Sequence, residues 1–316
     1  MAIAGGHIKL DSTEGMDKIT QTEKVTSPYF SGGSATLTGS NIVSSSLSDT
    51  NETYFFGISN STTPTVEEFN VAFGSTNGYG GDTGSNGTAS PTEAIYKQYS
   101  SLLLAPTEVT GGFIISSPAS DSSISSGKDE EIFILSARRS NMKDRINKGT
   151  WTVFLSGSSN SRLTRLSLTD DSVNNSPTAT PAGDRYNIIS GAAGTIVSAS
   201  TARNFGFFYP DAGLMIFSGA ELSRSIQGDS GSKDSTVVFA SGSQLGLGTI
   251  TSAGANTKQA LRFINCLQST VGDAELTFRD EEDQVSAQYF CRVRSGQMNF
   301  SNNPTFVSGT LNELRQ

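Results

Sequence analysis

A strict alternation of apolar and polar side chains near residue 280 constrains the fold of this chain most strongly. Ala274, Leu276 and Phe278 alternate with polar residues. After an acidic run, the same period of two continues at Val285, Ala287, Tyr289, Cys291 and Val293. A period of two is typical of strands that have one face on a core and one face in water. Two such stretches with a short acidic connection predict an antiparallel hairpin whose turn is Asp280-Glu281-Glu282-Asp283.

The composition extends this β prediction to the whole chain. Only 35% of the 316 residues are hydrophobic and 16% are charged, while Ser and Thr supply about a quarter and Gly another 33 residues. Ser and Thr compete for backbone hydrogen bonds in helices, and Gly loses conformational entropy there. The sequence therefore predicts a mostly β fold of antiparallel, sandwich-like sheets with long polar loops and about two short helices.

Apolar clusters place the remaining strands. Two continuous apolar runs, at 113–115 and 132–135, predict central strands that are buried on both faces. Tyr209-Pro210-Asp211-Ala212-Gly213 predicts a hairpin turn, and the polar residues 156–183 are expected to form a connection. The other predicted strands lie at 53–58, 69–73, 151–155, 186–189, 205–208 and 214–217.

Two segments have the spacing of amphipathic helices. Thr92–Leu104 places Ile95, Tyr99 and Leu102-Leu103 on one side. Thr257–Leu267 places four apolar residues on one face, with Thr257 as its cap. Those four residues are Ala260, Phe263, Ile264 and Leu267. A further short helix is expected to open at 218–222.

The expected domain organisation has three parts. Residues 1–50 are polar and poor in aromatics, which predicts an extended N-terminal arm that becomes ordered against another surface. Residues 51–160 form a β-rich domain with one helix. Residues 161–316 form a second β-rich domain with one helix and the C-terminal hairpin. A single domain that combines the last two parts is the alternative.

Charge, cysteines and hydropathy limit the classes of function. The net charge of −8 argues against nucleic acid as a partner, because phosphate binding needs a basic face. No apolar run approaches the length of a membrane span, and the first residues lack the features of a signal peptide. The chain is therefore expected to be made in a cytoplasm without membrane insertion. Cys266 and Cys291 are expected to be buried free thiols rather than a disulfide.

The motifs that suggest chemistry are weak, and no catalytic, cofactor-binding or metal-ligating residue is predicted. Gly228-Asp229-Ser230-Gly231 spells the nucleophile motif of trypsin-like proteases, but the only histidine, His7, stands near the first residue, far from any predicted strand. Four consecutive acids at 280–283 could bind a hard cation, although such a run is more often solvated charge. A carboxylate pair for glycoside hydrolysis stays open, with no pair nominated. The chain is not expected to be an enzyme.

A cluster of basic residues stands out on this acidic chain. Between the apolar run at 132–135 and the alternation that begins at Trp151 lie Arg138, Arg139, Lys143, Arg145 and Lys148. One interpretation is a solvated turn. The other is a contact surface for an acidic neighbouring subunit.

Four blocks in this order resemble virion structural proteins of contractile-tailed phages (myoviruses) of marine cyanobacteria. They are Ala94–Tyr99 with Leu102–Leu104, Ser136–Arg139 through Lys148–Trp151, Phe208–Gly213, and Phe290–Ser308 with its Phe300-Ser301-Asn302-Asn303-Pro304-Thr305-Phe306. The resemblance implies a structural component of the phage tail or baseplate, located in the virion and assembled in the host cytoplasm. The implied partners are other virion proteins and copies of the chain itself. The alternatives are a receptor-binding or fibre-like adhesion module of the particle and, more remotely, an envelope glycan hydrolase.

Overall fold

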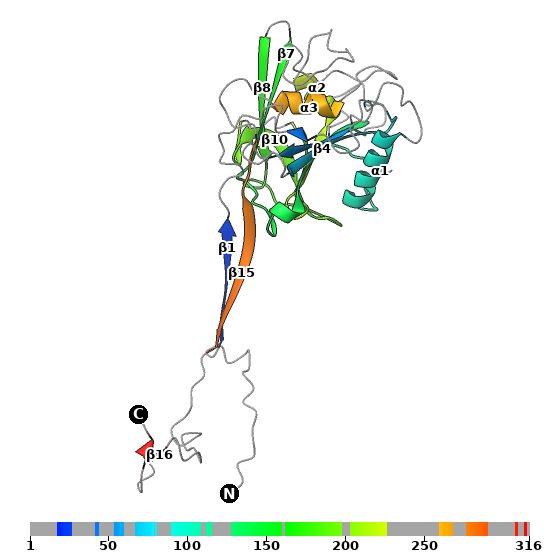
Figure 1. Cartoon of the computed structure of the whole chain (residues 1–316). Coiled ribbons are helices and arrows are strands. Elements are labelled where there is room, and N and C mark those ends of the chain that lie inside the picture. The colour runs from blue at the N-terminus through cyan, green and yellow to red at the C-terminus, as the bar shows by residue number, and fades with distance from the viewer. Residues whose placement is uncertain are drawn as a thin grey trace. The chain divides into compact units, whose positions relative to one another are not determined.

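Antiparallel β-sheet dominates the fold, with three short α-helices among the described residues (Figure 1). Strand accounts for 49% of the described residues and helix for 19%, which confirms the predicted mostly β class. The computed structural model describes residues 18–26, 42–43, 54–59, 67–78, 80, 90–108, 112–115, 128–159, 162–197, 203–225, 259–267, 276–289, 307–308 and 313–314.

The chain divides into two compact units. The larger unit comprises Thr26–Glu282, and the smaller unit comprises Met1–Val25 and Asp283–Gln316. Strand β15 (Asp280–Tyr289) begins in the larger unit and continues into the smaller one. The predicted domain boundary near residue 160 falls between β7 and β8, two strands that pair with each other.

The larger unit is built on one long antiparallel sheet. Its strand order is β14-β7-β8-β10-β12-β13-β5-β4-β3-β2, and every neighbouring pair is antiparallel. The bounds are β2 Ile42–Val43, β3 Phe55–Ser59, β4 Glu67–Ser75, β5 Glu131–Ala137, β7 Thr152–Ser159, β8 Arg162–Asp170, β10 Gly183–Ala192, β12 Gly206–Tyr209, β13 Leu214–Ser218 and β14 Leu276–Thr277. Two short strands, β9 (Thr178–Thr180) and β11 (Thr195–Ile196), also pair with β10.

This strand order consists of two meanders that meet at the centre of the sheet. The first runs from β2 to β5, and the second runs from β7 inward to β13. They join where β13 pairs with β5, with Phe217 opposite Phe133 and Ile216 opposite Ile134. Both strands are buried on both faces, which confirms the central position predicted for the run at 132–135.

The predicted hairpin at 205–217 is also confirmed. β12 and β13 pair with Tyr209 opposite Leu214. Gly213 has a φ of +66°, a backbone conformation that glycine adopts without strain, and its N–H donates to the Pro210 carbonyl at 3.2 Å. The turn residues therefore set the register of the two central strands.

Helix α1 (Pro91–Leu103) covers one face of the sheet. The Ser90 hydroxyl caps it by accepting a hydrogen bond from the Glu93 N–H at 3.3 Å. A Cβ added to Gly74 of β4 would lie 3.1 Å from the Tyr96 backbone nitrogen, so the glycine lets helix and sheet approach closely. Inward-facing residues of α1 include Tyr96 and Leu103, whereas Leu102 of the predicted apolar side is 56% exposed.

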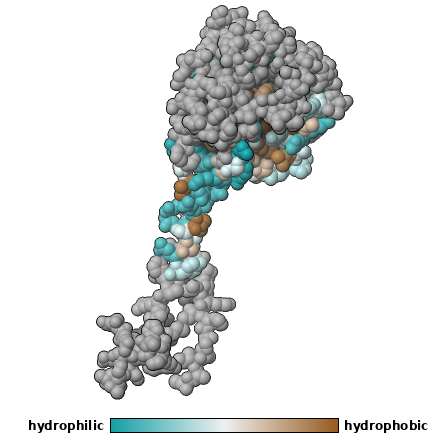
Figure 2. All heavy atoms as spheres, viewed as in Figure 1, coloured by the Kyte–Doolittle hydropathy of each residue, from teal (hydrophilic) through white to brown (hydrophobic). Residues whose placement is uncertain are grey.

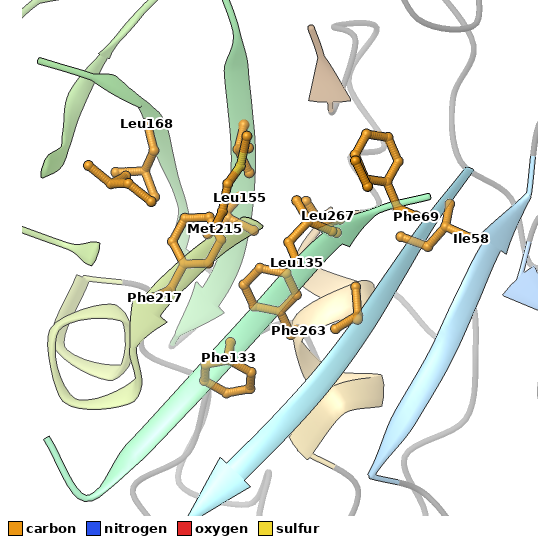
Figure 3. Close-up of a cluster of buried hydrophobic side chains, with 14 of the residues drawn as sticks. Ile58, Phe69, Phe133, Leu135, Leu155, Leu168, Met215, Phe217, Phe263 and Leu267 are labelled. Carbon is orange, nitrogen blue, oxygen red and sulfur yellow. The ribbon is translucent and has the colours of Figure 1, made fainter. Parts of the chain in front are cut away.

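Helices α2 (Gly219–Ser225) and α3 (Gln259–Leu267) contribute to the core on the other face. The four apolar residues predicted to share a face of α3 are all buried there, which confirms that prediction. Phe263 stacks on Phe133 with ring centroids 5.1 Å apart and also meets Phe217 (Figure 3). Cys266 of the same helix is a buried free thiol, as expected, and Cys291 lies outside the described residues.

The hairpin predicted around residues 280–283 is wrong. Those four acids open the continuous strand β15, and the preceding strand β14 pairs with β7, with Leu276 opposite Val153. β15 instead pairs with β6 (Arg145–Ile146) and with β1 (Lys18–Thr26). Lys143 and Arg145 pair with Glu282 and Glu281 here, so opposite charge offsets part of the acidic run where it continues as a strand.

Two other predictions fail for identifiable reasons. Residues 113–115 are extended but belong to no strand. The Ile115 N–H donates a hydrogen bond to the Asp129 carboxylate at 2.7 Å instead of to a neighbouring strand. The connection predicted at 156–183 contains β8, where Leu168 is buried and Leu166 packs against the core two residues away. Thr and Ser fit a pleated surface well enough for this alternation to form a strand.

The remaining described strands lie in or near the predicted arm and at the C-terminal end. β2 pairs with β3 in the large sheet, and β1 pairs with β15. β16 (Val307–Ser308) pairs with β17 (Glu313–Leu314). Both described strands of the arm are thus paired with segments later in the chain.

Truncation of Phe263 is expected to destabilise the larger unit strongly. The side chain is fully buried between strands β5 and β13, so Phe263→Ala should lower the free energy of unfolding by about 3–5 kcal/mol. Leu102→Ala, at an exposed helix position, should change it by no more than about 0.5 kcal/mol. Urea denaturation followed by circular dichroism measures both values, and equal effects would contradict the described core.

The contribution of Glu131 to the stability of the protein should fall as the pH rises from about 4.5 to about 8. Burial, aided by the neighbouring Glu130 charge, raises the pKa of Glu131 from its ordinary value near 4.5 to about 8. The folded state therefore holds a proton that the unfolded state has already released. Stabilisation from Glu131 is complete below about pH 4.5 and disappears as the folded-state carboxyl ionises. The denaturation midpoint should depend less on pH between 5 and 9 in Glu131→Gln than in the wild-type chain. An unchanged pH dependence would exclude Glu131 as its source.

Candidate assembly surface

The basic turn, residues 138–148, connects the central strand β5 to β7, which lies next to the edge strand β14. It contains a 3-10 helix, η4 (Arg139–Asn141), followed by β6. The backbone of the turn donates hydrogen bonds to two other segments. The Ile146 N–H donates to the Pro210 carbonyl at 3.1 Å, and the Asn147 N–H donates to the Arg279 carbonyl at 2.7 Å. The turn thus ties the β12–β13 hairpin to the residues that lead into β15.

Ion pairs reinforce this backbone connection. The Arg145 Nε lies 2.9 Å from Glu281 Oε1, and the carboxylate side chain is only 6% exposed. Another nitrogen of the same side chain, Arg145 Nη1, lies 3.8 Å from Asp211 Oδ1. Lys143 forms a more exposed pair with Glu282 at 2.7 Å, and this hydrogen bond raises the pKa of the Lys143 ammonium. Arg145 therefore provides the charge that allows Glu281 to be buried.

The remaining residues of the predicted cluster have different surroundings. Arg139 donates to the backbone carbonyls of Asp144 at 2.8 Å and Asp211 at 3.3 Å. Lys148 donates to the Tyr186 hydroxyl at 2.8 Å, which raises the pKa of its ammonium, while Arg138 is exposed. The structure thus brings Arg139, Lys143, Arg145 and Lys148 into contacts within the chain. The predicted role of the cluster in subunit contact stays a prediction.

These contacts change the interpretation of the acidic run. Asp280 and Glu281 are buried, so the run is not the solvated turn expected from the sequence. Among the residues with described positions, no group of three or more His, Cys, Asp or Glu side chains could hold a metal ion. Ser230 and His7, the residues of the protease motif, lie outside the described part of the chain.

Beyond Glu282, β15 and its partner β1 form a strand pair in the smaller unit. We call this pair, Lys18–Val25 with Asp283–Tyr289, the β-ribbon. Every residue of β15 from Asp283 to Tyr289 is exposed, and Val285 and Tyr289 remain 66% and 56% accessible. Residues 20–24 of β1 are exposed as well. Figure 2 shows the exposed strand pair as mostly hydrophilic, with isolated hydrophobic residues.

The β-ribbon lacks the usual support of a strand pair in water. An isolated two-stranded ribbon is marginally stable at best, and three strands or a hydrophobic face packed on a helix are normally needed. The exposed side chains of the ribbon show that neither face is packed on a core. This surface is the best candidate functional site in the described part of the chain.

Sequence reasoning missed the ribbon and the ionic contact at its base for one reason. The basic turn and the acidic run are more than one hundred residues apart, and each was interpreted alone. The opposite charges of the two blocks were the signal that could have paired them. The period of two in 283–289 was visible, but periodicity does not say whether a strand is covered.

Loss of the Arg145 charge should cost far more stability than loss of the Lys143 charge. Arg145→Met removes an ion pair from the nearly buried Glu281 carboxylate, so the free energy of unfolding should fall by about 3–5 kcal/mol. Lys143→Met breaks an exposed pair and should cost less than about 1 kcal/mol. Chemical denaturation of both variants tests the difference. Recovery of stability in Arg145→Met/Glu281→Leu would support the pairing, and equal losses would refute it.

No family model, curated protein or solved structure matches this chain. None of the described helices is both long and apolar enough to span a membrane.

Proposed function

We propose that this chain is a structural component of a phage particle, belonging to the tail or baseplate, and that it acts by protein–protein assembly. The observation that carries the proposal is the β-ribbon, which exposes both faces of a strand pair to solvent. Such a pair gains stability when another protein surface or strand covers it.

The resemblance to virion proteins provides a second argument. Two of its blocks, Ser136–Trp151 and Phe208–Gly213, contact each other in the fold: Ala137 N–H donates to the Gly213 carbonyl at 2.8 Å, and Ile146 N–H donates to Pro210. The first block, Ala94–Tyr99 with Leu102–Leu104, lies on helix α1 and its C-cap. These residues form backbone contacts and a helix of the fold, which supports a shared architecture more than a shared catalytic site.

The ionic contact at the start of β15 fits the same function. Arg145 and Lys143 hold Glu281 and Glu282, the last residues of β15 within the larger unit. The ribbon begins directly after them.

Assembly also agrees with the acidic character of the chain. A net charge of −8 keeps unassembled copies soluble and apart. Contacts in a symmetric particle repeat in every copy, so even modest affinity per contact gives a stable ring. The partners are other virion proteins and copies of the chain.

Immunogold electron microscopy of contractile-tailed particles tests the proposal. An antibody against the full chain should label the tail or baseplate of particles from an infected marine cyanobacterial culture. Mass spectrometry of the purified particles should find the chain in a copy number that is a multiple of three or six, as tail symmetry requires. The chain's absence from the particles, or its release of reducing sugar from host envelope polysaccharide, would refute the proposal.

A further inference from the structure

We propose that Asn77-Gly78, in the turn after β4, is a site of spontaneous deamidation that the fold protects and that reacts when this turn opens. In an Asn-Gly pair, the backbone nitrogen of the glycine can attack the asparagine side chain, because glycine has no Cβ to hinder the approach. The site lies outside the β-ribbon, and the inference does not depend on the proposed particle role.

The reaction needs water as its only co-reactant. The Gly78 nitrogen forms a bond to Asn77 Cγ and gives up its proton, the bond from Cγ to Nδ2 breaks, and the amide leaves as ammonia with that proton. Water then opens the cyclic imide at either of its two carbonyls. The product at position 77 is an aspartate or an isoaspartate, and each has a carboxylate where the amide was.

Three hydrogen bonds in the folded turn oppose the attack. The Gly78 N–H donates to the Ser75 carbonyl at 3.2 Å, and Gly78 is buried, so the attacking nitrogen is both occupied and shielded from solvent. The Asn77 N–H donates to the Ser75 hydroxyl at 3.3 Å. The Asn77 side chain is exposed, but its Nδ2 donates to Glu130 Oε2 at 3.2 Å, which restrains the amide under attack.

The chain is also held on both sides of the turn. The Thr76 N–H donates to the Glu130 carbonyl at 2.8 Å, directly after the last residue pair between β4 and β5. Beyond the turn, the Gly80 carbonyl accepts the N–H of Gln259, the first residue of α3, at 3.1 Å. The turn therefore opens only when one of these attachments is lost, and deamidation records such local opening.

The product fits this turn less well than the asparagine does. A carboxylate at position 77 faces Glu130 where the Asn77 amide now donates a hydrogen bond, so an attractive contact becomes a repulsive one. An isoaspartate also lengthens the main chain between Ser75 and Gly80, so the hydrogen bonds on the two sides of the turn cannot all keep their geometry. A deamidated chain should therefore unfold at a lower denaturant concentration than the unmodified chain.

Peptide mapping by mass spectrometry measures the deamidation rate of the full chain in buffer and in a urea concentration that unfolds it. A synthetic peptide of residues 73–81 in both solvents corrects for any effect of urea on the chemistry itself. Position 77 should react at least about tenfold more slowly in the folded chain than in the unfolded chain, because the turn must first open. Equal corrected rates in buffer and in urea would overturn the inference.

Matched variants at one position test the restraint on the amide. Glu130→Ala removes the acceptor of Asn77 Nδ2 and should raise the deamidation rate of the folded chain severalfold. Glu130→Gln keeps an oxygen acceptor and should react like the wild-type chain. Ser75→Ala removes the hydroxyl that accepts the Asn77 N–H, should also raise the rate, and replaces Glu130→Ala if circular dichroism shows that variant to be unfolded. A rate that neither alanine variant changes would refute protection by the turn.

Discussion

The ion pair between Arg145 and Glu281 is the interaction on which the rest of the arrangement depends. It neutralises a buried carboxylate at the point where β15 starts, and the same arginine reaches Asp211 in the β12–β13 turn. One side chain therefore joins the crossover from β5 to β7, the central hairpin and the root of the ribbon. The backbone bonds of Ile146 and Asn147 keep these three segments in register. Charge and main-chain hydrogen bonding act together here, because a buried pair is stable only when its geometry is fixed.

Much of the fold was predictable because it depends on local patterns. The burial of β5, the β12–β13 turn and the apolar face of α3 each follow from residues adjacent in sequence. The pairing of β15 could not be predicted in this way, because it depends on charges that lie far apart in the chain. A period of two describes a strand but leaves open which strand lies beside it.

The candidate site was predictable only in part. Basic residues at 138–148 were recognisable as a cluster, yet the choice between solvent, a partner subunit and the chain itself depends on tertiary structure. Glu281 shows the difficulty: four adjacent acids suggest exposure, whereas in the fold Arg145 makes burial of this carboxylate possible. Helix α1 gives the opposite case, because polar Thr92 and Ser100 are buried while apolar Leu102 faces outward. Helical periodicity identifies the more apolar face of a helix. The close approach of α1 to Gly74 depends on shape, which periodicity does not describe.

The seam between the two meanders, where β13 pairs with β5, has a consequence for how the protein folds. β5 and β13 are separated in sequence by the other strands of the second meander, so their pairing closes a long loop. Loop closure across a whole meander costs entropy before any contact repays it. Each meander can form from neighbouring strands, but the shared core of Phe133, Phe217 and Phe263 exists only after the seam and α3 are in place. During synthesis, the first meander would therefore have to wait, with its inner edge uncovered, until the second has left the ribosome.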